Sequence, residues 1–344
     1  MHTQDAGRER ALRGALWGTA LGDALGLRYE GLSARDIARS IDPAAGLGLW
    51  GAHLFVSDDT EQTALVLESI VLARADLPAA LRSFRSALRG WFLRLPFGIG
   101  LSTLRACLRM LFGSQAPGVA SAGNGAAMRA GIIGVYFSSQ REERRRFAEA
   151  LARVTHTDVR AVEGAVYTAE LAALCARPPT RDRAELVRLA ARGIREPELR
   201  AGIDAALRLS GTQHHAELAP NTGYVVHTLA LCTWAFIREG EHALSAIQAV
   251  IRAGGDTDTA AAIVGGWLGA LHGPESLPAA LLARLDDGPF GAQHLAALAH
   301  SSETEHVPAW SRLQALRRNL GLYPVVLAHG FLRLVRGQLR GRWA

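Results

Sequence analysis

The sequence lacks the features that mark disulfide-rich, secreted and membrane-spanning proteins. Its three cysteines, Cys107, Cys175 and Cys232, are isolated and odd in number, so they indicate neither a disulfide framework nor a zinc site. No uninterrupted apolar run reaches the length of a membrane span. The N-terminal segment carries charges of both signs, and its apolar stretch is broken by Asp23, which argues against a signal peptide. We therefore expect a cytoplasmic protein with single, buried thiols.

Lysine is absent too, so all of the positive charge is arginine, and the formal net charge is +6. Such a surface would attract a phosphate-bearing ligand or an acidic protein partner. No recognition motif and no interleaving of aromatic and basic residues indicates a nucleic-acid partner. A high arginine and alanine content without lysine is typical of genome composition bias, so we give the charge no functional weight.

Strand-like alternation is nearly absent, whereas helical spacing of apolar residues dominates, which predicts an all-α fold. With 344 residues, of which 49% are hydrophobic, the chain can bury an ample core. No linker divides it. Besides a first helix of small residues at 14–26 and an apolar run at 64–72, the spacing predicts helices over 79–94, 101–112, 141–154, 159–176, 183–193, 197–209, 223–239, 241–253 and 258–272.

Two short acidic clusters lie far apart in the chain. The first is Ser57-Asp58-Asp59-Thr60, and the second is Gly254-Gly255-Asp256-Thr257-Asp258-Thr259. Carboxylate and hydroxyl oxygens suit hard divalent cations such as Mg²⁺ or Mn²⁺ and not zinc. If folding brings the clusters together, four carboxylates converge, and such a concentration of like charge is stable only when cations neutralise it.

A simpler interpretation is that each cluster caps a helix. Asp58 with Glu61 three residues later matches an N-cap pattern, and Asp256 or Thr257 could cap the second helix. Carboxylates in a first turn also favour the helix dipole. The two interpretations are compatible, because a metal site can lie at helix N-termini.

Three further segments combine small residues with polar side chains before a helix. Ser121 to Arg129 is a glycine-containing loop that would let backbone N–H groups approach a phosphate. His156 precedes an apolar helix and is either a ligand contact or structural. Tyr224, at another helix start, either faces a ligand or packs. Glu30, just beyond the first helix, could be a general base or an ordinary surface carboxylate.

Taken in order, these segments resemble the ADP-ribosylglycohydrolase family, whose members include the dinitrogenase reductase-activating glycohydrolase. The match runs over roughly residues 11–272. Its elements are Gly22-Asp23-Ala24-Leu25-Gly26 with Glu30, Ser57-Asp58-Asp59-Thr60, Gly123-Asn124-Gly125 with Ala127-Met128-Arg129, Thr155-His156, Gly223-Tyr224-Val225-Val226 and Gly254-Gly255-Asp256-Thr257-Asp258-Thr259.

The resemblance implies a compact, orthogonal helical bundle with a central cleft that contains two Mg²⁺ or Mn²⁺ ions. By motif, the metal ligands would be Ser57, Asp58, Asp59, Asp256, Asp258 and Thr259. The substrate-binding residues would be Ser121, Gly123, Asn124, Gly125, Met128, His156 and Tyr224, with the first four near the diphosphate. The catalytic carboxylates would be Glu30, Asp58 and Asp59, and the sequence does not decide which of them accepts the proton of the attacking water.

One departure from the family pattern concerns the acceptor. Relatives that act on ADP-ribosyl-arginine often carry Asp-Ile-Gly where this chain has Gly98-Ile99-Gly100. A carboxylate implicated in arginine-linked chemistry is therefore missing, which leaves the acceptor open among arginine, serine, a nucleobase and a small molecule.

The resemblance implies a metal-dependent hydrolase that cleaves the glycosidic bond between ADP-ribose and an acceptor, with an ADP-ribosylated protein or conjugate as its partner. Two alternatives remain: an immunity protein that neutralises an ADP-ribosylating toxin, and an ADP-ribose-binding homologue without turnover. We expect a flexible N-terminus over residues 1–10, a single domain over residues 11–307 and a basic amphipathic helical extension, packed on the domain, over residues 308–344.

Overall fold

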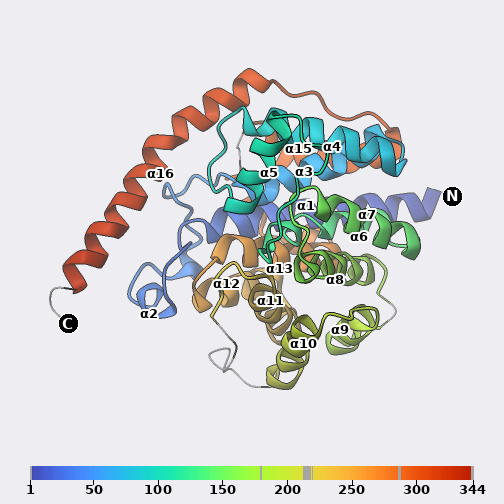
Figure 1. The fold of residues 1–344 in the computed structure, drawn as a ribbon. Coiled ribbons are helices and arrows are strands. Elements are labelled where there is room, and N and C mark those ends of the chain that lie inside the picture. The colour runs from blue at the N-terminus through green and yellow to red at the C-terminus, as the bar shows by residue number, and fades with distance from the viewer. Residues whose placement is uncertain (1, 179, 212–217, 219, 286–287, 342–344) are drawn as a thin grey trace.

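The computed structural model describes residues 2–178, 180–211, 218, 220–285 and 288–341, and for residues 2–6 and 332–341 it describes the backbone alone. Within these ranges the chain is predominantly helical, and extended segments form only isolated β-bridges (Figure 1). The predicted all-α fold is confirmed.

The longer helices are α1 (His2–Gly26), α3 (Asp58–Leu72), α4 (Leu77–Phe92), α5 (Leu101–Leu111), α7 (Arg141–Arg153), α8 (Val159–Ala176), α9 (Arg183–Ala191), α10 (Pro197–Leu209), α11 (Val225–Glu239), α12 (Ala243–Ala253), α13 (Thr257–His272), α15 (Ala292–Thr304) and α16 (Arg312–Gly341). The shorter helical segments are α2 (Ala34–Ile37), η1 (Pro43–Ala45), η2 (Asn124–Ala126), α6 (Gly131–Tyr136), η4 (Pro274–Ser276), α14 (Ala279–Leu282) and η5 (Gly288–Phe290).

Every helix predicted from apolar spacing is present. The ends lie within two residues of the predicted ones, except that α1 begins at His2 rather than at residue 14 and α3 begins at Asp58 rather than at residue 64. The local chemistry explains several of these ends. Asp76 accepts a hydrogen bond from Ala79 N at the start of α4, where a proline occupies the first turn, and Asp158 caps α8 by accepting from Arg160 N. The sequence did not predict α6 and α15.

Helices α1 and α13 pack along each other with small residues at their contact. Gly18 of α1 faces Gly265 of α13, and Gly22 faces Ala261. A Cβ atom added to either Gly18 or Gly22 would lie 2.1 Å from the facing carbonyl oxygen. The glycines therefore permit the two backbones to touch, as expected for glycine inside a helix. This contact carries Asp23 of α1 to the N-terminal end of α13.

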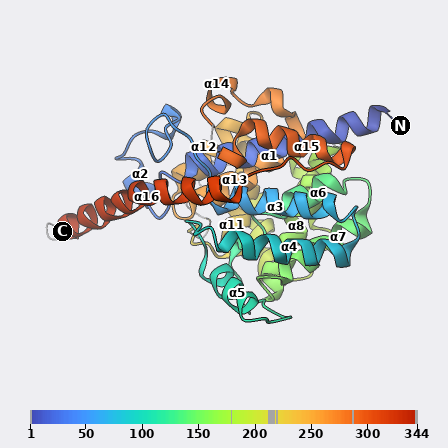
Figure 2. The same ribbon diagram turned by 90° about the horizontal axis from the view of Figure 1, so that it is seen from above.

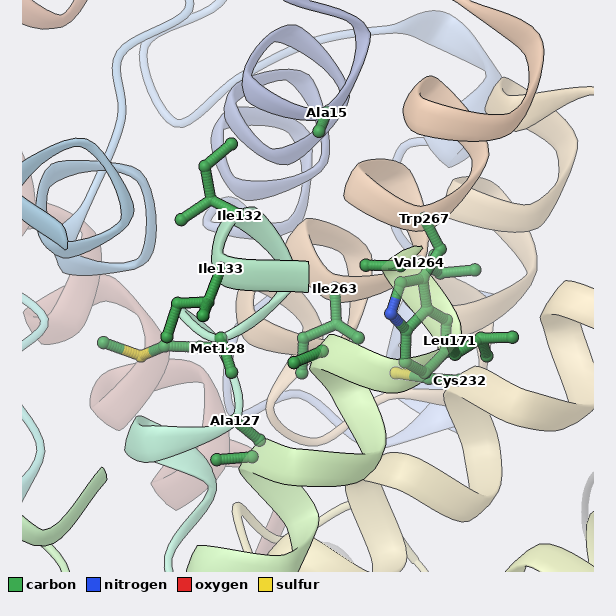
Figure 3. Close-up of a cluster of buried hydrophobic side chains, with 14 of the residues drawn as sticks. Ala15, Ala127, Met128, Ile132, Ile133, Leu171, Cys232, Ile263, Val264 and Trp267 are labelled. Carbon is green, nitrogen blue, oxygen red and sulfur yellow. The ribbon is translucent and has the colours of Figure 1, made fainter. Parts of the chain in front are cut away.

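The core lies around α13 and is apolar on the sides that α6, α8 and α11 cover (Figure 3). Trp267 of α13 is 1% exposed, and its Nε1 donates to the Thr168 carbonyl oxygen of α8 at 3.1 Å. The three cysteines are buried free thiols, as expected. Figure 3 shows Ile263, Val264 and Trp267 among Met128, Ile132, Ile133, Leu171 and Cys232.

Both ends of the described chain are helical. We predicted a flexible end over residues 1–10, but α1 begins at His2, and Arg8 donates to the Ser302 carbonyl oxygen at 3.1 Å. At the other end, α16 follows the outside of the molecule and then projects beyond it (Figures 1 and 2). Ala315 and Asn319 of α16 are buried, whereas Phe331 is 66% exposed. The division of the chain at residues 10 and 307 stays a prediction.

Within the described residues, no helix combines the length and the apolar character that crossing a membrane requires.

Candidate metal centre and cleft

The two acidic clusters meet in space. The first turn of α3 carries Asp58 and Asp59, and the first turn of α13 carries Asp258 and Thr259. Thr259 Oγ1 lies 3.3 Å from Asp59 Oδ2, and Asp59 Oδ2 also lies 3.4 Å from Ser57 Oγ. Both helices therefore begin at one point, and the carboxylates that the sequence separates by about 200 positions converge there.

The double glycine before α13 lets its loop reach this point. Gly254 and Gly255 have φ angles of +79° and +81°, which L-residues with side chains rarely adopt. A Cβ atom on Gly255 would lie 1.7 Å from the Asn221 carbonyl oxygen. Gly255 also exchanges backbone hydrogen bonds with the segment after α1, because its N–H donates to Leu32 O and its carbonyl accepts from Gly31 N.

Capping by the cluster residues does not explain the clusters. Ser57 and Asp256 occupy the N-cap positions of α3 and α13, and neither side chain makes a capping hydrogen bond. The cap of α3 comes instead from another helix. The Asp23 carboxylate of α1 accepts from Ser57 N at 2.9 Å, from Thr60 N at 3.1 Å and from Thr60 Oγ1 at 2.5 Å.

Asp23 is a residue of the site that the sequence analysis did not assign. Oxygens of Asp23, Asp59 and Asp258 all lie within 4.8 Å of one another, and the three side chains are buried. Because both Asp23 oxygens already accept hydrogen bonds, we interpret it as the residue that fixes the start of α3. The available signal was a single acidic residue inside a helix of small and apolar residues.

The carboxylates of the centre are held away from water. Burial raises the pKa of Asp58, Asp59 and Asp258 well above the usual range, and repulsion among them and the neighbouring Glu30 raises the pKa of Asp58 and Asp258 further. Burial also raises the pKa of Asp23 to about 6, although hydrogen bonds from Thr60 and Ser57 lower it. The negative charge of these carboxylates, when they are ionised, must be compensated by cations; otherwise the carboxylates retain protons.

One oxygen in the centre has no partner among the described residues. Asp59 Oδ1 is fully buried and accepts no hydrogen bond. A buried carboxylate oxygen without a donor is costly, since the desolvation of that group is not repaid. Carboxylate and hydroxyl oxygens at this point form the ligand set of Mg²⁺ or Mn²⁺. The residues present therefore fit a divalent cation.

Asp256 is oriented by a network of neutral side chains. Asn124 Nδ2 donates to Asp256 Oδ2 at 2.7 Å and to Thr228 Oγ1 at 3.0 Å. Thr228 in turn donates to Asn221 Oδ1, and Asn221 Nδ2 donates to the Asp256 carbonyl oxygen at 2.6 Å. Asn124, predicted to bind substrate, thus links the glycine-rich loop to the second acidic cluster.

Asp58 is oriented by a second chain of hydrogen bonds that the sequence analysis did not identify. Gln62 Nε2 donates to Asp58 Oδ2 at 3.0 Å, and Gln62 Oε1 accepts from Arg129 at 2.9 Å. Arg129 is 1% exposed and also donates to Thr155 Oγ1. Burial lowers the pKa of Arg129 to about 10. Arg129 is therefore a buried structural cation.

A cavity of about 520 Å³ opens beside the acidic clusters. Its wall contains most of the residues predicted for catalysis, metal binding and substrate binding. The lining residues include Glu30, Asp58, Asp256, Asp258, Thr259, Gly123, Asn124, Gly125, Met128 and His156. Ser57 and Asp59 lie behind this wall, where they are 1% exposed. The cavity therefore has an acidic side and a side formed by the glycine-rich loop.

His156 presents a ring nitrogen to the glycine-rich loop. Its Nε2 lies 3.4 Å from the position that a Cβ atom on Gly123 would occupy. Burial, with the nearby Arg129, lowers its pKa to about 3, so the ring is neutral near pH 7. Because Arg129 donates to Thr155 Oγ1, that hydroxyl can donate to His156 Nδ1 at 2.8 Å. The remaining proton then lies on Nε2, which becomes a donor.

Two predicted substrate residues lie outside this wall. Ser121 Oγ accepts from Ser102 Oγ at 2.7 Å and from Gly123 N at 3.3 Å, so it supports the loop. Tyr224 directs its hydroxyl to Glu198 and accepts from Arg160 at 3.2 Å. A contact between Tyr224 and a ligand stays a prediction.

Gly98 lies directly beside the acidic side of the cavity. A Cβ atom at this position would be 2.9 Å from Asp58 Oδ1, and the φ angle of +80° disfavours any side chain. The carboxylate absent from the Gly98-Ile99-Gly100 segment would therefore stand against Asp58. Without it, the cavity is open there, next to Ser102 and Thr103.

Comparison with known proteins places this geometry in context. A model of the ADP-ribosylglycohydrolase family matches residues 4–312. An uncharacterised protein of Archaeoglobus fulgidus is 32% identical over 278 residues, which cover 76% of this chain and 88% of the relative. A solved structure described as an ADP-ribosylglycohydrolase-related protein complex is similar with a TM-score of 0.68 and 26% identity, and the match covers 87% of this chain and 98% of the other.

Proposed function

This chain belongs to the ADP-ribosylglycohydrolase family, and from that premise we propose that it hydrolyses the glycosidic bond between ADP-ribose and an acceptor with the help of two Mg²⁺ or Mn²⁺ ions. Family membership supports a hydrolase of the glycohydrolase type. The proposed ligand is an ADP-ribosylated protein or a smaller ADP-ribose conjugate.

One observation carries the proposal: residues of both acidic clusters line one cavity together with the glycine-rich loop. Asp59 Oδ2 lies 3.3 Å from Thr259 Oγ1, and Asp59 Oδ1 is buried without a donor. Asp58, Asp256 and Asp258 line the same cavity. When bound there, divalent cations would neutralise the carboxylates, attract ribose hydroxyls and acidify a water.

The glycine-rich loop and His156 suit the diphosphate. Gly123 and Gly125 bear no side chain toward the cavity, so a phosphate oxygen can approach the loop backbone closely, including the Gly125 N–H group. His156, whose pKa is lowered to about 3, contributes a neutral N–H donor from Nε2 when Thr155 Oγ1 donates to its Nδ1. These donors would hold the ligand so that its distal ribose points toward Asp58 and Asp258.

Glu30 is the proposed proton acceptor. It lines the cavity, whereas Asp59 lies behind the wall and Asp58 accepts a hydrogen bond from Gln62. Departure of the acceptor from the anomeric carbon leaves an oxocarbenium-like centre, to which water adds while a carboxylate takes one of the water protons. Passage of that proton to the released acceptor completes the hydrolysis. Such general-base assistance contributes about 10²–10⁴ in rate.

A panel of defined substrates tests the proposal. ADP-ribose linked to arginine, serine, a nucleobase and a small alcohol would each be incubated with the protein in Mg²⁺, in Mn²⁺ and in EDTA, and free ADP-ribose would be measured. The expected result is release from at least one substrate, abolished by EDTA. Tight binding of ADP-ribose without release from any substrate would identify a binding protein instead, and release that persists in EDTA would contradict the metal centre.

A further inference from the structure

The C-terminal helix α16 begins where the match to the family ends, at residue 312. Its first half is not a free appendage. Its Arg318 is nearly enclosed, with a side chain that is 11% exposed. Arg318 pairs there with Glu61, whose side chain is 4% exposed. The distance between Arg318 Nη1 and Glu61 Oε1 is 2.6 Å. Glu61 belongs to the same first turn of α3 as Asp58 and Asp59.

Arg318 holds the start of α3 at two points. Besides its pair with Glu61, it donates from Nη2 to the carbonyl oxygen of Val56, the residue before Ser57. The other Glu61 oxygen accepts from Trp91 Nε1 at 2.6 Å, so the carboxylate is fixed from two sides. A bidentate guanidinium on a buried carboxylate and a carbonyl gives a defined geometry, which a flexible lysine does not reproduce.

A small apolar cluster next to this pair is closed by the same helix. Leu27, Phe55 and Phe97 form a second cluster of buried residues, and Leu322 and Val326 of α16 pack against it. The phenyl rings of Phe55 and Phe97 meet edge to face, with centroids 5.9 Å apart. This cluster is separate from the main core, and α16 covers one side of it.

Each of the three cluster residues lies shortly before a residue of the cavity. Leu27 is followed by Glu30, Phe55 by Asp58, and Phe97 by Gly98. The helix therefore packs on the three chain segments that lead into the acidic side of the cavity.

Side chains of α16 also form hydrogen bonds with the backbone of the same segments. Asn319 Nδ2 donates to the Arg94 carbonyl oxygen at 2.8 Å, and Tyr323 donates to the Pro96 carbonyl oxygen at 3.3 Å. The ring of His329 lies 3.1 Å from the carbonyl oxygen of Arg28, two residues before Glu30. The contacts thus extend along the helix from residue 318 to residue 329.

We propose that α16 is a positioning element of the candidate metal centre, acting through Arg318 and the apolar cluster that Leu322 and Val326 close. Arg318 is a positioning residue, because it acts on the centre through Glu61 and Val56, which flank the metal-ligand candidates at the start of α3. The part of this proposal that concerns cations rests on the proposed function. Its physical basis is that the start of α3 and the turn at Gly98 are held from the outside by α16 rather than by the family domain alone.

The test compares three substitutions in the full chain. Arg318→Ala removes both contacts, whereas Arg318→Lys keeps the charge but not the planar guanidinium that reaches two acceptors at once. Arg317→Ala removes the same charge from the exposed neighbouring position. Mn²⁺ affinity would be measured by calorimetry well below the melting temperature. Hydrogen exchange of the peptides covering residues 54–61 and 95–98 would be measured without metal.

We expect Arg318→Ala to raise the Kd for Mn²⁺ about 10–100-fold, the range found when a residue that orients a metal ligand is lost. The same variant should speed hydrogen exchange at residues 54–61. Arg318→Lys should lie between it and the unaltered protein, and Arg317→Ala should match the unaltered protein in both measurements. If Arg318→Ala does not fold, the Kd for Mn²⁺ and the exchange rates of Arg318→Lys are compared with those of Arg317→Ala, and equal values would contradict the positioning role.

A general loss of stability must be distinguished from loss of position. Trp310→Phe provides that control, because Trp310 donates to Glu68 at 3.1 Å, about 15 Å further along α3 than Asp58 by helical rise. It should lower the melting temperature and leave Mn²⁺ affinity unchanged.

Two outcomes would overturn the proposal. One is an Arg318→Ala protein whose Kd for Mn²⁺ stays within about twofold of the Arg317→Ala value, whatever its exchange rates. The other applies if the unaltered protein binds no Mn²⁺: the proposed function then fails on its own, and equal exchange at residues 54–61 in the two variants overturns the positioning role as well. In that second case alone, faster exchange in Arg318→Ala than in Arg317→Ala would support the positioning role.

Discussion

Thr259 Oγ1 of α13 lies 3.3 Å from Asp59 Oδ2 of α3, although 200 positions separate the two residues in the chain. This contact joins the two acidic clusters and shows that they form one centre. It depends on the packing of α1 along α13, because Asp23 of α1 caps α3 by accepting from Ser57 N and Thr60 N. The centre is therefore a junction of three helices.

Loss of one carboxylate should remove cation binding and turnover together. In Asp59→Ala or Asp256→Ala, we expect the release of ADP-ribose to fall by at least about 10²-fold, because the cation charge at the reacting sugar is lost. Calorimetry with Mn²⁺ and the substrate panel provide the measurements. Asp204→Ala, an exposed position on α10, is the matched control. Turnover near the unaltered level in either variant, insensitive to EDTA, would refute the metal centre.

Glu30→Gln should separate binding from chemistry. Glutamine keeps the size of the side chain but does not accept a proton, so we expect kcat to fall about 10²–10⁴-fold. The Kd for ADP-ribose, measured by calorimetry, should change little. Unchanged kcat would remove Glu30 as the base and leave Asp58, which lines the same cavity.

Asn124→Ala should weaken the centre without removing a ligand. The amide holds Asp256 Oδ2 at 2.7 Å, and loss of an orienting donor typically lowers metal affinity about 10–100-fold. Titration of Mn²⁺ checks this effect. Thr228→Val removes the other end of the network and serves as a comparison, since Thr228 reaches Asp256 only through Asn124 and Asn221. An effect of Thr228→Val larger than that of Asn124→Ala would contradict the direct role of Asn124.

The stabilisation of the protein by Mn²⁺ should grow with pH. Burial raises the pKa of Asp23 to about 6 and raises those of Asp58 and Asp59, so the metal-free folded state retains protons that the unfolded chain has lost. The metal-free protein therefore loses stability from these groups as pH rises through 4 to 6 and beyond. A cation replaces those protons, so the rise in melting temperature on adding Mn²⁺ should be larger at pH 8 than at pH 5.

His156 changes stability in the opposite direction but does not affect that comparison. Its pKa is lowered to about 3, so its stabilising contribution is present above about pH 6.5 and is lost as pH falls toward 3. It acts on the metal-free and metal-loaded proteins alike, and the difference between their melting temperatures isolates the carboxylates. A shift that is equal at both pH values would contradict the predicted proton displacement.

Gly22→Ala should disturb the junction through helix packing alone. The new Cβ would lie 2.1 Å from the Ala261 carbonyl oxygen, so α1 and α13 must separate. Overpacking of this kind costs about 1–3 kcal/mol in the free energy of unfolding, which urea denaturation would measure. Gly7→Ala is the matched control on the same helix, where a Cβ atom meets nothing within 4 Å. Equal effects of the two substitutions would contradict the close contact.

Apolar spacing predicted the helices well because they are long and amphipathic or wholly buried, as α8 and α10 show. It did not predict α15, although Leu295 and Leu298 in that helix are fully buried. The motifs predicted most of the cavity wall, because oxygen-rich clusters and a glycine-containing loop are unusual in a helical protein. Asp23, Gln62 and Arg129 were not assigned, since their roles arise from hydrogen bonds to residues remote in the chain.

By itself, the sequence determined the all-α class, the helix positions and the presence of two carboxylate clusters at helix starts. These features follow from local periodicity and from residue type. Only the tertiary structure decided that Asp23 caps α3 across a glycine contact, that Tyr224 turns toward Glu198, and that Arg318 of α16 holds Glu61. The reason is physical: such contacts depend on which helix faces pack together, and no local pattern in a chain specifies its distant neighbour.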